Sequence, residues 1–287
     1  MSDSEYHEYP GALPDGEEVP RDVVPLSVGG NRFVPLYIFL IVLAILAGLV
    51  SVASRWKKEV VVRDFVIDGV SIIADKELLS RIMIFKGRNL QELDAEELKQ
   101  KIMVLPYLRE AVITKELNGS VRVRVTEREP VAITFIDGRK TVIDREGFLL
   151  PWKPVVAERF PKLLEISGIS RLKTAGNDLQ QLDMHDVVLI LHFLEALAET
   201  EYASILVCEL HLSGNNMTWY TAVQPPTRFI VGNDGNFKEK LKKFEIFWQK
   251  VISKKGFGCY DTVDLRFRDR IFTTVLVPPK VPQSISQ

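Results

Sequence analysis

The chain contains one long stretch of apolar positions, at residues 33–54, in which no residue is charged. As a helix this stretch would extend about 33 Å, enough to cross the roughly 30 Å hydrocarbon core of a bilayer. It is apolar on every face, unlike an amphipathic core helix, and it begins too late and runs too long for a usual signal peptide. We therefore predict an uncleaved transmembrane helix at residues 33–54.

The segment before this helix, residues 1–32, is rich in Pro, Gly and acidic residues and has no periodic apolar positions. Such a composition predicts a disordered tail. Basic residues flank the helix on both sides, with Arg21 and Arg32 before it and a cluster from Arg55 to Arg63 after it. That distribution mildly favours a cytoplasmic C-terminal region, but long domains cross membranes largely regardless of charge, so the orientation stays open on this ground.

Residues 60–129 alternate between strand and helix patterns. A β-rich start ends at a turn at Asp68-Gly69, and two amphipathic helices follow, opened by Asp75 and by the N-cap residue Asp94. A hairpin turn at Asn118-Gly119 then joins two strands, and alternating Val residues place one face of the second strand against a core. These patterns predict a β-α-α-β-β domain in which two helices cover one face of a three-stranded sheet.

Residues 130–277 show short strands separated by turn residues, and at least two helices, at residues 182–198 and 237–252. The strands are expected at residues 131–136, 141–144, 148–150, 203–212, 217–223, 227–231, 262–267 and 271–277. We predict a mostly antiparallel β domain with helices, followed by a flexible tail at residues 278–287. The chain as a whole is therefore expected to belong to the α+β class.

The composition gives no sign of catalytic or nucleic-acid-binding chemistry. The net charge is −1, and Cys208 and Cys259 lie far apart without a metal-binding spacing, so they are either free or paired. His185 and His192 fall on one face of a predicted helix but about 10 Å apart along its axis, too far to share a metal. We therefore predict no catalytic residue, no metal site, no cofactor and no nucleic-acid partner, and a function in binding other proteins.

Three parts of the chain resemble those of one bacterial family. They are VIDGV at residues 66–70, LPYLREAVITKELNGSVRVRVTEREPVA at residues 105–132 with IDREG at residues 143–147, and TVDLRF at residues 262–267. In this order and spacing, after a membrane helix, the chain is similar to the cell-division protein family called FtsQ or DivIB. The resemblance covers nearly the whole chain after Phe33, and it implies a POTRA domain at residues 60–129 and a β domain at residues 130–277.

The resemblance also implies an orientation and a function. Family members have a cytoplasmic N-terminal tail, and their two domains lie outside the inner membrane, in the periplasm or its equivalent, at the division septum. They are non-enzymatic scaffolds that bind two small coiled-coil membrane proteins, FtsB and FtsL, and help to recruit or regulate the septal cell-wall synthases. The POTRA surface is expected, on resemblance alone, to bind other division proteins. The alternative function is a membrane-anchored POTRA accessory of protein export or envelope assembly.

The expected binding site is the last strand of the β domain. Residues 271–276 are apolar or β-branched and uncharged, and an exposed edge strand of this kind can pair with a strand of another chain. In the family, this strand and the Arg-Tyr just before it contact FtsB, and the matching positions here are Arg266 and Phe267, where Phe lacks the Tyr hydroxyl. The partner-binding residues are therefore expected to be Arg266, Phe267, Ile271, Phe272, Thr273, Thr274, Val275 and Leu276.

Strand alternation allows a second interpretation of residues 262–267. Val263, Leu265 and Phe267 would share one face, which would then belong to the core. Arg266 would face water beside Asp264. The sequence leaves both interpretations open.

Overall fold

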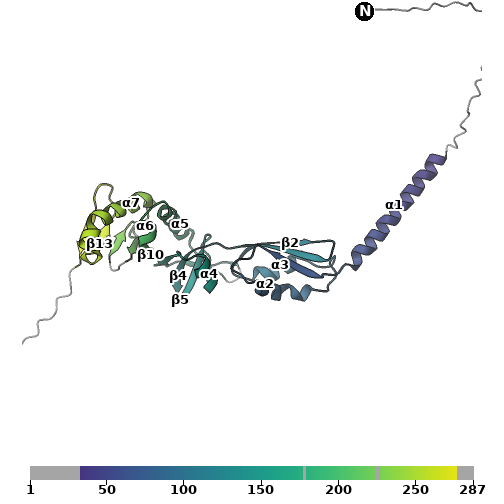
Figure 1. The fold of residues 1–287 in the computed structure, drawn as a ribbon, viewed down its shortest axis with the longest axis horizontal. Coiled ribbons are helices and arrows are strands. Elements are labelled where there is room, and N and C mark those ends of the chain that lie inside the picture. Colours follow the sequence, from purple (N-terminus) through teal and green to yellow (C-terminus); the bar gives the residue numbers. More distant parts are fainter. Residues whose placement is uncertain (1–32, 177–178, 224–226, 277–287) are drawn as a thin grey trace, which may run out of the picture. The chain divides into compact units, whose positions relative to one another are not determined.

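The computed structural model describes residues 33–176, 179–223 and 227–276, so the expected tails at residues 1–32 and 278–287 lie outside the described residues. The chain divides into two units between Arg55 and Trp56. The predicted apolar helix is present as α1 (Val34–Glu59; Figure 1). Its segment Val34–Val52 has a mean hydropathy of 2.6 and is long and apolar enough to cross a membrane.

The second unit begins with the expected β-α-α-β-β arrangement, called here the first module (residues 60–128). Its elements are β1 (Asp64–Asp68), α2 (Asp75–Ile82) with a 3₁₀ turn at Met83–Phe85, α3 (Ala95–Met103), β2 (Leu108–Lys115) and β3 (Ser120–Glu127). The three strands pair in the order β1-β3-β2, with β1 parallel and β2 antiparallel to β3. The helices α2 and α3 pack on one face of this sheet, as predicted (Figure 1).

The two faces of β3 differ as its alternating sequence predicts. Val121 and Val123 are fully buried in the core that includes α2 and α3. Arg122 lies on the opposite face and forms ion pairs with Asp68 and Glu116, each at 2.9 Å. The outer face of this sheet is therefore polar, and its charged side chains form ion pairs with one another.

The remaining residues form the second module (residues 129–276), built on a nine-stranded sheet. Its strands are β4 (Pro130–Ile136), β5 (Arg139–Asp144), β6 (Leu149–Pro151), β7 (Leu164–Ser167), β10 (Val207–His211), β11 (Trp219–Ala222), β12 (Arg228–Ile230), β13 (Tyr260–Asp264) and β14 (Phe272–Val275). They pair in the order β14-β13-β12-β11-β10-β7-β4-β5-β6, and a hairpin of β8 (Leu172–Thr174) and β9 (Gln180–Leu182) lies outside this sheet. Five of the eight neighbouring pairs are antiparallel, as predicted.

Two helices of this module connect parallel neighbours in the sheet. Its helices are α4 (Pro154–Arg159), α5 (Met184–Ala198), α6 (Ala203–Leu206), α7 (Phe237–Phe247) with a π-helical turn at Trp248–Ile252, and α8 (Ser253–Lys255). The crossover through α5 joins β7 to β10, and that through α7 joins β12 to β13. Both crossovers step in the same direction along the sheet, so both helices lie on one face, where they pack against each other (Figure 1). The carboxyl ends of β7, β10, β12 and β13 consequently lie side by side at one end of their strands.

The structure corrects several predicted boundaries. Residues 203–206 form α6 rather than the start of a strand, because Glu245 of α7 accepts hydrogen bonds from the N–H groups of Tyr202 and Ala203, at 2.8 and 3.1 Å, and so caps a short helix. The helix expected at residues 237–252 changes to a π-helical turn after Phe247. Residues 154–159, for which no element was predicted, form α4, which begins with a proline at a position that needs no N–H.

The two modules share one core. Val142, Leu150 and Val156 of the second module are fully buried in the same cluster as the helices of the first. The Tyr107 hydroxyl donates to the Pro151 carbonyl at 2.7 Å across the junction, and burial raises the pKa of this phenol. The first module therefore covers β6, at one edge of the nine-stranded sheet, whereas β14 forms the other edge.

Candidate partner-binding site

β14 pairs with β13 alone within the described part of the chain and presents its other side as a free edge. All four of its residues are exposed, and the exposed fractions reach 51% for Phe272 and 62% for Val275. Ile271 and Leu276, at the two ends of the expected site, are half-buried. The strand has no charged side chain that would oppose pairing with a strand of another chain.

A hydrogen bond between β13 and β12 shows which way the backbone groups of β13 point. The N–H of Leu265, just after β13, donates to the Ile230 carbonyl of β12 at 2.9 Å. Backbone groups alternate in direction along a strand, so those of Thr262 and Asp264 point the other way, toward β14.

The same alternation identifies the unused backbone groups of β14. Thr274 and Phe272 lie directly opposite the two β13 residues that point toward this strand, so their backbone groups face inward. Those of Thr273 and Val275 therefore point away from β13. A strand arriving at this edge would form its hydrogen bonds with Thr273 and Val275.

Arg266 lies beyond the end of β13 and is held within the fold. Its guanidinium pairs with the Asp264 carboxylate, with Nη2 and Oδ2 2.6 Å apart, and its Nη1 donates to the Asn216 carbonyl at 3.0 Å. The Arg266 N–H also donates to Asp264 Oδ1 at 3.1 Å. The Asp264 carboxylate thus ends the strand at Asp264 rather than at Phe267, and its hydrogen bonds raise the pKa of Arg266.

Phe267 does not lie on the core face that Val263 and Leu265 occupy. Those two residues are fully buried, whereas Phe267 is 47% exposed, so the strand alternation ends before it. The Phe267 ring lies edge to face against Phe272, with the ring centroids 4.8 Å apart. Two of the expected site residues therefore form one exposed aromatic pair beside the free edge.

Three residues that the sequence interpretation did not single out help to shape this site. The Asn216 carbonyl and the Met217 sulfur accept hydrogen bonds from Arg266, and Lys243 of α7 donates to the Phe267 carbonyl at 3.0 Å. Asn216 adopts a left-handed φ of 58°, a conformation in which Asn is enriched. Its sequence signals a turn, but the contact with Arg266 spans 50 residues, which no local pattern reveals.

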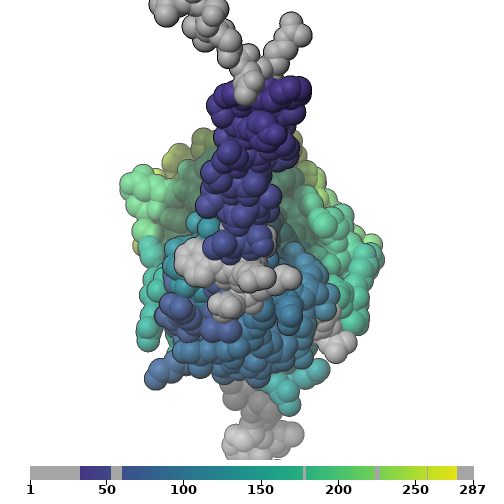
Figure 2. Space-filling view, turned by 90° about the vertical axis from the view of Figure 1, so that its right-hand side faces the viewer, coloured from purple at the N-terminus to yellow at the C-terminus, as the bar shows by residue number. Residues whose placement is uncertain are grey.

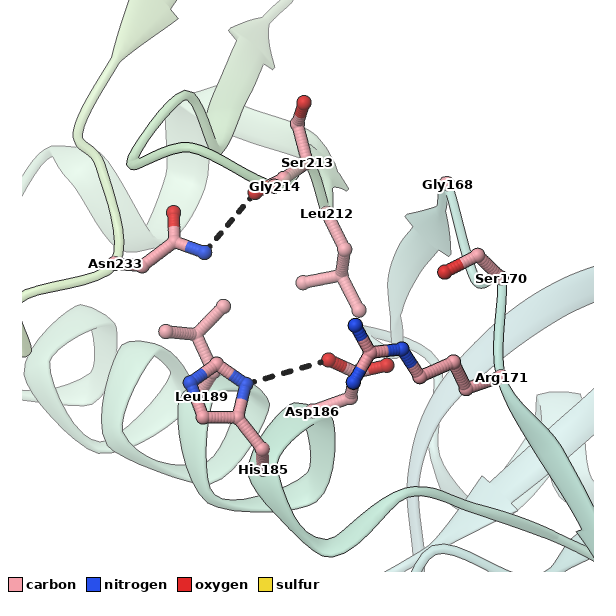
Figure 3. Close-up of a pocket in the computed structure, with 10 residues that line it drawn as sticks. All are labelled: Gly168, Ser170, Arg171, His185, Asp186, Leu189, Leu212, Ser213, Gly214 and Asn233. Carbon is pink, nitrogen blue, oxygen red and sulfur yellow. Dashed lines mark hydrogen bonds and ion pairs between the residues drawn. The ribbon is translucent and has the colours of Figure 1, made fainter.

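A polar pocket of about 270 Å³ lies beside the carboxyl ends of β7 and β10, where α5 begins (Figure 3). Its lining includes Arg171, His185, Asp186 and Asn233. His185 Nδ1 lies 3.6 Å from Asp186 Oδ1, and the Asn233 amide donates to the Ser213 carbonyl at 3.0 Å. These contacts belong to the fold, and we assign no chemistry to the pocket.

The described residues contain no group of three His, Cys, Asp or Glu side chains placed to hold a metal ion. Cys208 and Cys259 are both free thiols. The features that stand out are the free edge of β14 and its aromatic pair, and both are suited to binding another protein.

Two family models match the chain. Residues 60–128 match the model described as a POTRA domain of FtsQ type. Residues 129–274 match the model described as FtsQ/DivIB, C-terminal related. The first module is accordingly a POTRA domain, and the second is called the β domain below.

Curated proteins with similar sequences carry the names of the same family. The chain is 24% identical over 241 residues to the cell division protein FtsQ of Rhodothermus marinus, an alignment that covers 82% of this chain and 85% of that protein. It is 23% identical over 208 residues to the cell division protein DivIB of Clostridium acetobutylicum, covering 70% and 78% of the two chains. A shorter alignment, 35% identical over 95 residues, relates it to FtsQ of Myxococcus fulvus and covers 33% of this chain and 32% of that protein. With both domains matched from residue 60 to residue 274, the chain belongs to the FtsQ/DivIB family of cell-division proteins.

Proposed function

We propose that this protein is a non-enzymatic scaffold that captures FtsB-like and FtsL-like membrane proteins and links them to septal cell-wall synthesis. Its family supports a role in the divisome. The observation that carries the proposed binding mode is the free edge of β14, where the backbone groups of Thr273 and Val275 point outward from an exposed, uncharged strand.

Addition of a partner strand to this edge accounts for both affinity and specificity. Main-chain hydrogen bonds to Thr273 and Val275 would supply affinity, and the side chains around them would select the partner. The exposed pair of Phe267 and Phe272 offers an apolar contact next to the strand, and aromatic side chains are enriched among residues that dominate binding energies. Arg266, whose side chain is 25% exposed, borders this surface.

Location in the membrane is part of the same proposal. The apolar helix α1 is compatible with single-pass anchoring. We place the N-terminal tail in the cytoplasm and both domains outside the inner membrane at the septum, with the POTRA surface open to further division proteins. Because the partners are themselves membrane proteins, tethering to one bilayer raises their effective concentration, so a short strand interface suffices.

Co-purification of the full-length protein from its own cells in mild detergent tests the proposal, and we expect FtsB-like and FtsL-like chains to be recovered. Thr273→Pro removes an N–H that β13 does not use, so it should abolish this recovery while the domain stays folded. Thr274→Pro is the matched contrast. The Thr274 N–H faces β13, so its loss should lower the stability of the domain, which Thr273→Pro should not do. Undiminished recovery with Thr273→Pro would rule out strand addition at this edge.

A further inference from the structure

The POTRA domain has an exposed surface at the end where the chain enters it from α1. Three segments meet there: residues 60–63, residues 83–91, and residues 115–119, which are the last residue of β2 and the β2–β3 connection. We call this the proximal surface, and Figure 2 looks onto the POTRA domain, drawn in blue, from this end.

Backbone hydrogen bonds hold the three segments side by side. The Val62 N–H donates to the Arg88 carbonyl, and the Gly87 N–H donates to the Val62 carbonyl, both at 2.9 Å. The Arg63 N–H donates to the Gly119 carbonyl at 2.8 Å. The side chains of the proximal surface are therefore carried by one fixed frame rather than by three independent loops.

Large apolar side chains gather on this frame. Leu117 is 72% exposed, Ile84 55%, Met83 48% and Val61 41%. Single exposed apolar residues are ordinary, but a group of them on adjoining loops marks a surface that meets an apolar medium or another protein.

The charges interleaved with these apolar residues are mostly positive. The three segments carry the exposed cations Arg63, Lys86, Arg88 and Lys115. The only acidic residue in the segments is Glu116, and its carboxylate is paired with Arg122. Arg88 lies 3.9 Å from Glu97 on the neighbouring helix, so Arg63, Lys86 and Lys115 supply most of the available positive charge.

The length of chain between α1 and the POTRA domain limits how far this surface can lie from a bilayer. The apolar span ends at Val52, the helix continues to Glu59, and Val60 follows directly. The helical residues between Val52 and Val60 extend about 10 Å, against roughly 6 Å for one headgroup layer. At any tilt of the helix, Val60 is therefore within a few ångströms of the headgroups.

We propose that the proximal surface rests on the bilayer that α1 spans and binds its anionic phospholipids. Ile84 and Leu117 enter the interfacial region, and Arg63, Lys86 and Lys115 bind headgroup phosphates. Apolar and cationic side chains together fit a lipid surface better than a protein groove, because the apolar side chains reach the acyl-chain boundary while the cations bind the phosphates just above it. The inference rests on α1 spanning a membrane, and not on the proposed binding at β14.

Site-directed spin labelling of the full-length protein in vesicles tests this contact. With Cys208 and Cys259 replaced by Ser, nitroxides at Ile84→Cys or Leu117→Cys should collide with lipid-soluble oxygen more than with a water-soluble nickel chelate in phosphatidylcholine vesicles containing phosphatidylglycerol. Ile205→Cys, at an exposed position of the β domain (68%), is the control and should show the reverse. Flotation of each variant with the vesicles verifies anchoring by α1, so failed anchoring is distinguished from a failed contact.

Charge variants complete the test. Lys86→Gln and Arg63→Gln should each lower the ratio of lipid-contacting to water-exposed label about five-fold, while Lys86→Arg leaves it unchanged. Labels at positions 84 and 117 as water-exposed as the label at position 205 would overturn the proposal. So would equal lipid contact in vesicles without phosphatidylglycerol, or shielding of the labels only after FtsB-like and FtsL-like proteins are added.

Discussion

Arg128 and Asp144 form an ion pair, Nη1 to Oδ2 at 2.8 Å, that joins the POTRA domain to the β domain. The Asp144 side chain is only 2% exposed and also accepts hydrogen bonds from the N–H groups of Phe148 and Glu146, at 2.7 and 2.9 Å. Burial raises the pKa of the Asp144 carboxyl, and the Arg128 guanidinium and these N–H groups oppose that rise. Arg128 lies in the segment at residues 105–132 and Asp144 in the segment at residues 143–147, both of which resemble the family. These two segments therefore contribute to the domain junction.

Removing the cation of this pair should destabilise the fold strongly. Arg128→Met leaves the Asp144 carboxyl buried without its partner, and we expect the free energy of unfolding to fall by about 3–5 kcal/mol. Urea denaturation of a fragment of residues 56–287 measures the change. Glu129→Gln is the control, because the pair between Glu129 and Arg145 is exposed and should contribute less than about 1 kcal/mol. Similar losses in the two variants would contradict a special role for the buried pair.

The junction also shows which features the sequence could predict. Asp94 caps α3 through the Glu96 N–H, and the valines of β3 face the core, because both signals depend on near neighbours in the chain. In contrast, the Glu127 carboxylate accepts hydrogen bonds from the N–H groups of residues 71–73, which lie up to 56 residues away. No periodicity encodes a contact of that range, although the contact explains why β3 ends with a carboxylate at Glu127.

The β domain was less predictable for the same reason. Turn residues and β-rich runs indicated most of its strands, but β7, β8 and β9 were missed. Nothing local shows that β7 lies beside β10 or β12 beside β13. At the candidate site, the uncharged last strand could be read from its composition. The pairing of Phe267 with Phe272 could not, because alternation equally allowed a core position for Phe267.

Two buried tyrosines should respond in opposite ways to loss of the hydroxyl. The Tyr220 hydroxyl makes no hydrogen bond to any described residue, whereas the Tyr107 hydroxyl donates to the Pro151 carbonyl. Tyr220→Phe should raise the free energy of unfolding by about 1 kcal/mol, because an unpaired buried hydroxyl loses its hydration without compensation, and Tyr107→Phe should lower it by about 1 kcal/mol. Thermal unfolding of both variants provides the measurement. If both variants lost stability by the same amount, the difference in hydrogen bonding between the two hydroxyls would be refuted.

Lys240 Nζ and the Asp234 carboxylate form an ion pair, which should give the stability a defined pH dependence. Burial alone would raise the pKa of Asp234, but hydrogen bonds from Lys240 and from the Asn236 N–H outweigh it and bring the pKa below the ordinary value of 3.8. The stabilisation is therefore fully present above pH 3.8 and is lost as the pH falls through the lowered pKa. The stability difference between the wild type and Asp234→Asn should be constant at neutral pH and shrink below 3.8. If the stability difference instead grew on acidification, the pKa of Asp234 would be raised in the folded protein rather than lowered.

The aromatic pair should contribute more to partner affinity than other exposed apolar residues. Phe272→Ala removes one ring of the pair beside the free edge, and we expect affinity for an FtsB-like partner to fall about 10–30-fold, as for a typical aromatic hot spot. Ile205→Ala, at a comparably exposed position on α6, should leave affinity unchanged. Titration calorimetry with the extracytoplasmic part of the partner measures both, and equal effects would place the interface elsewhere.

Residue-resolved amide hydrogen exchange of the protein, alone and in complex with an FtsB-like partner, tests strand addition at β14 most directly. In the free protein the Thr273 and Val275 amides should exchange quickly, because they point to the free edge, while the Thr274 amide is already protected by β13. In the complex, exchange at Thr273 and Val275 should slow sharply and that at Thr274 should change little. Unaltered exchange at Thr273 and Val275 in a complex that demonstrably forms would contradict capture at this edge.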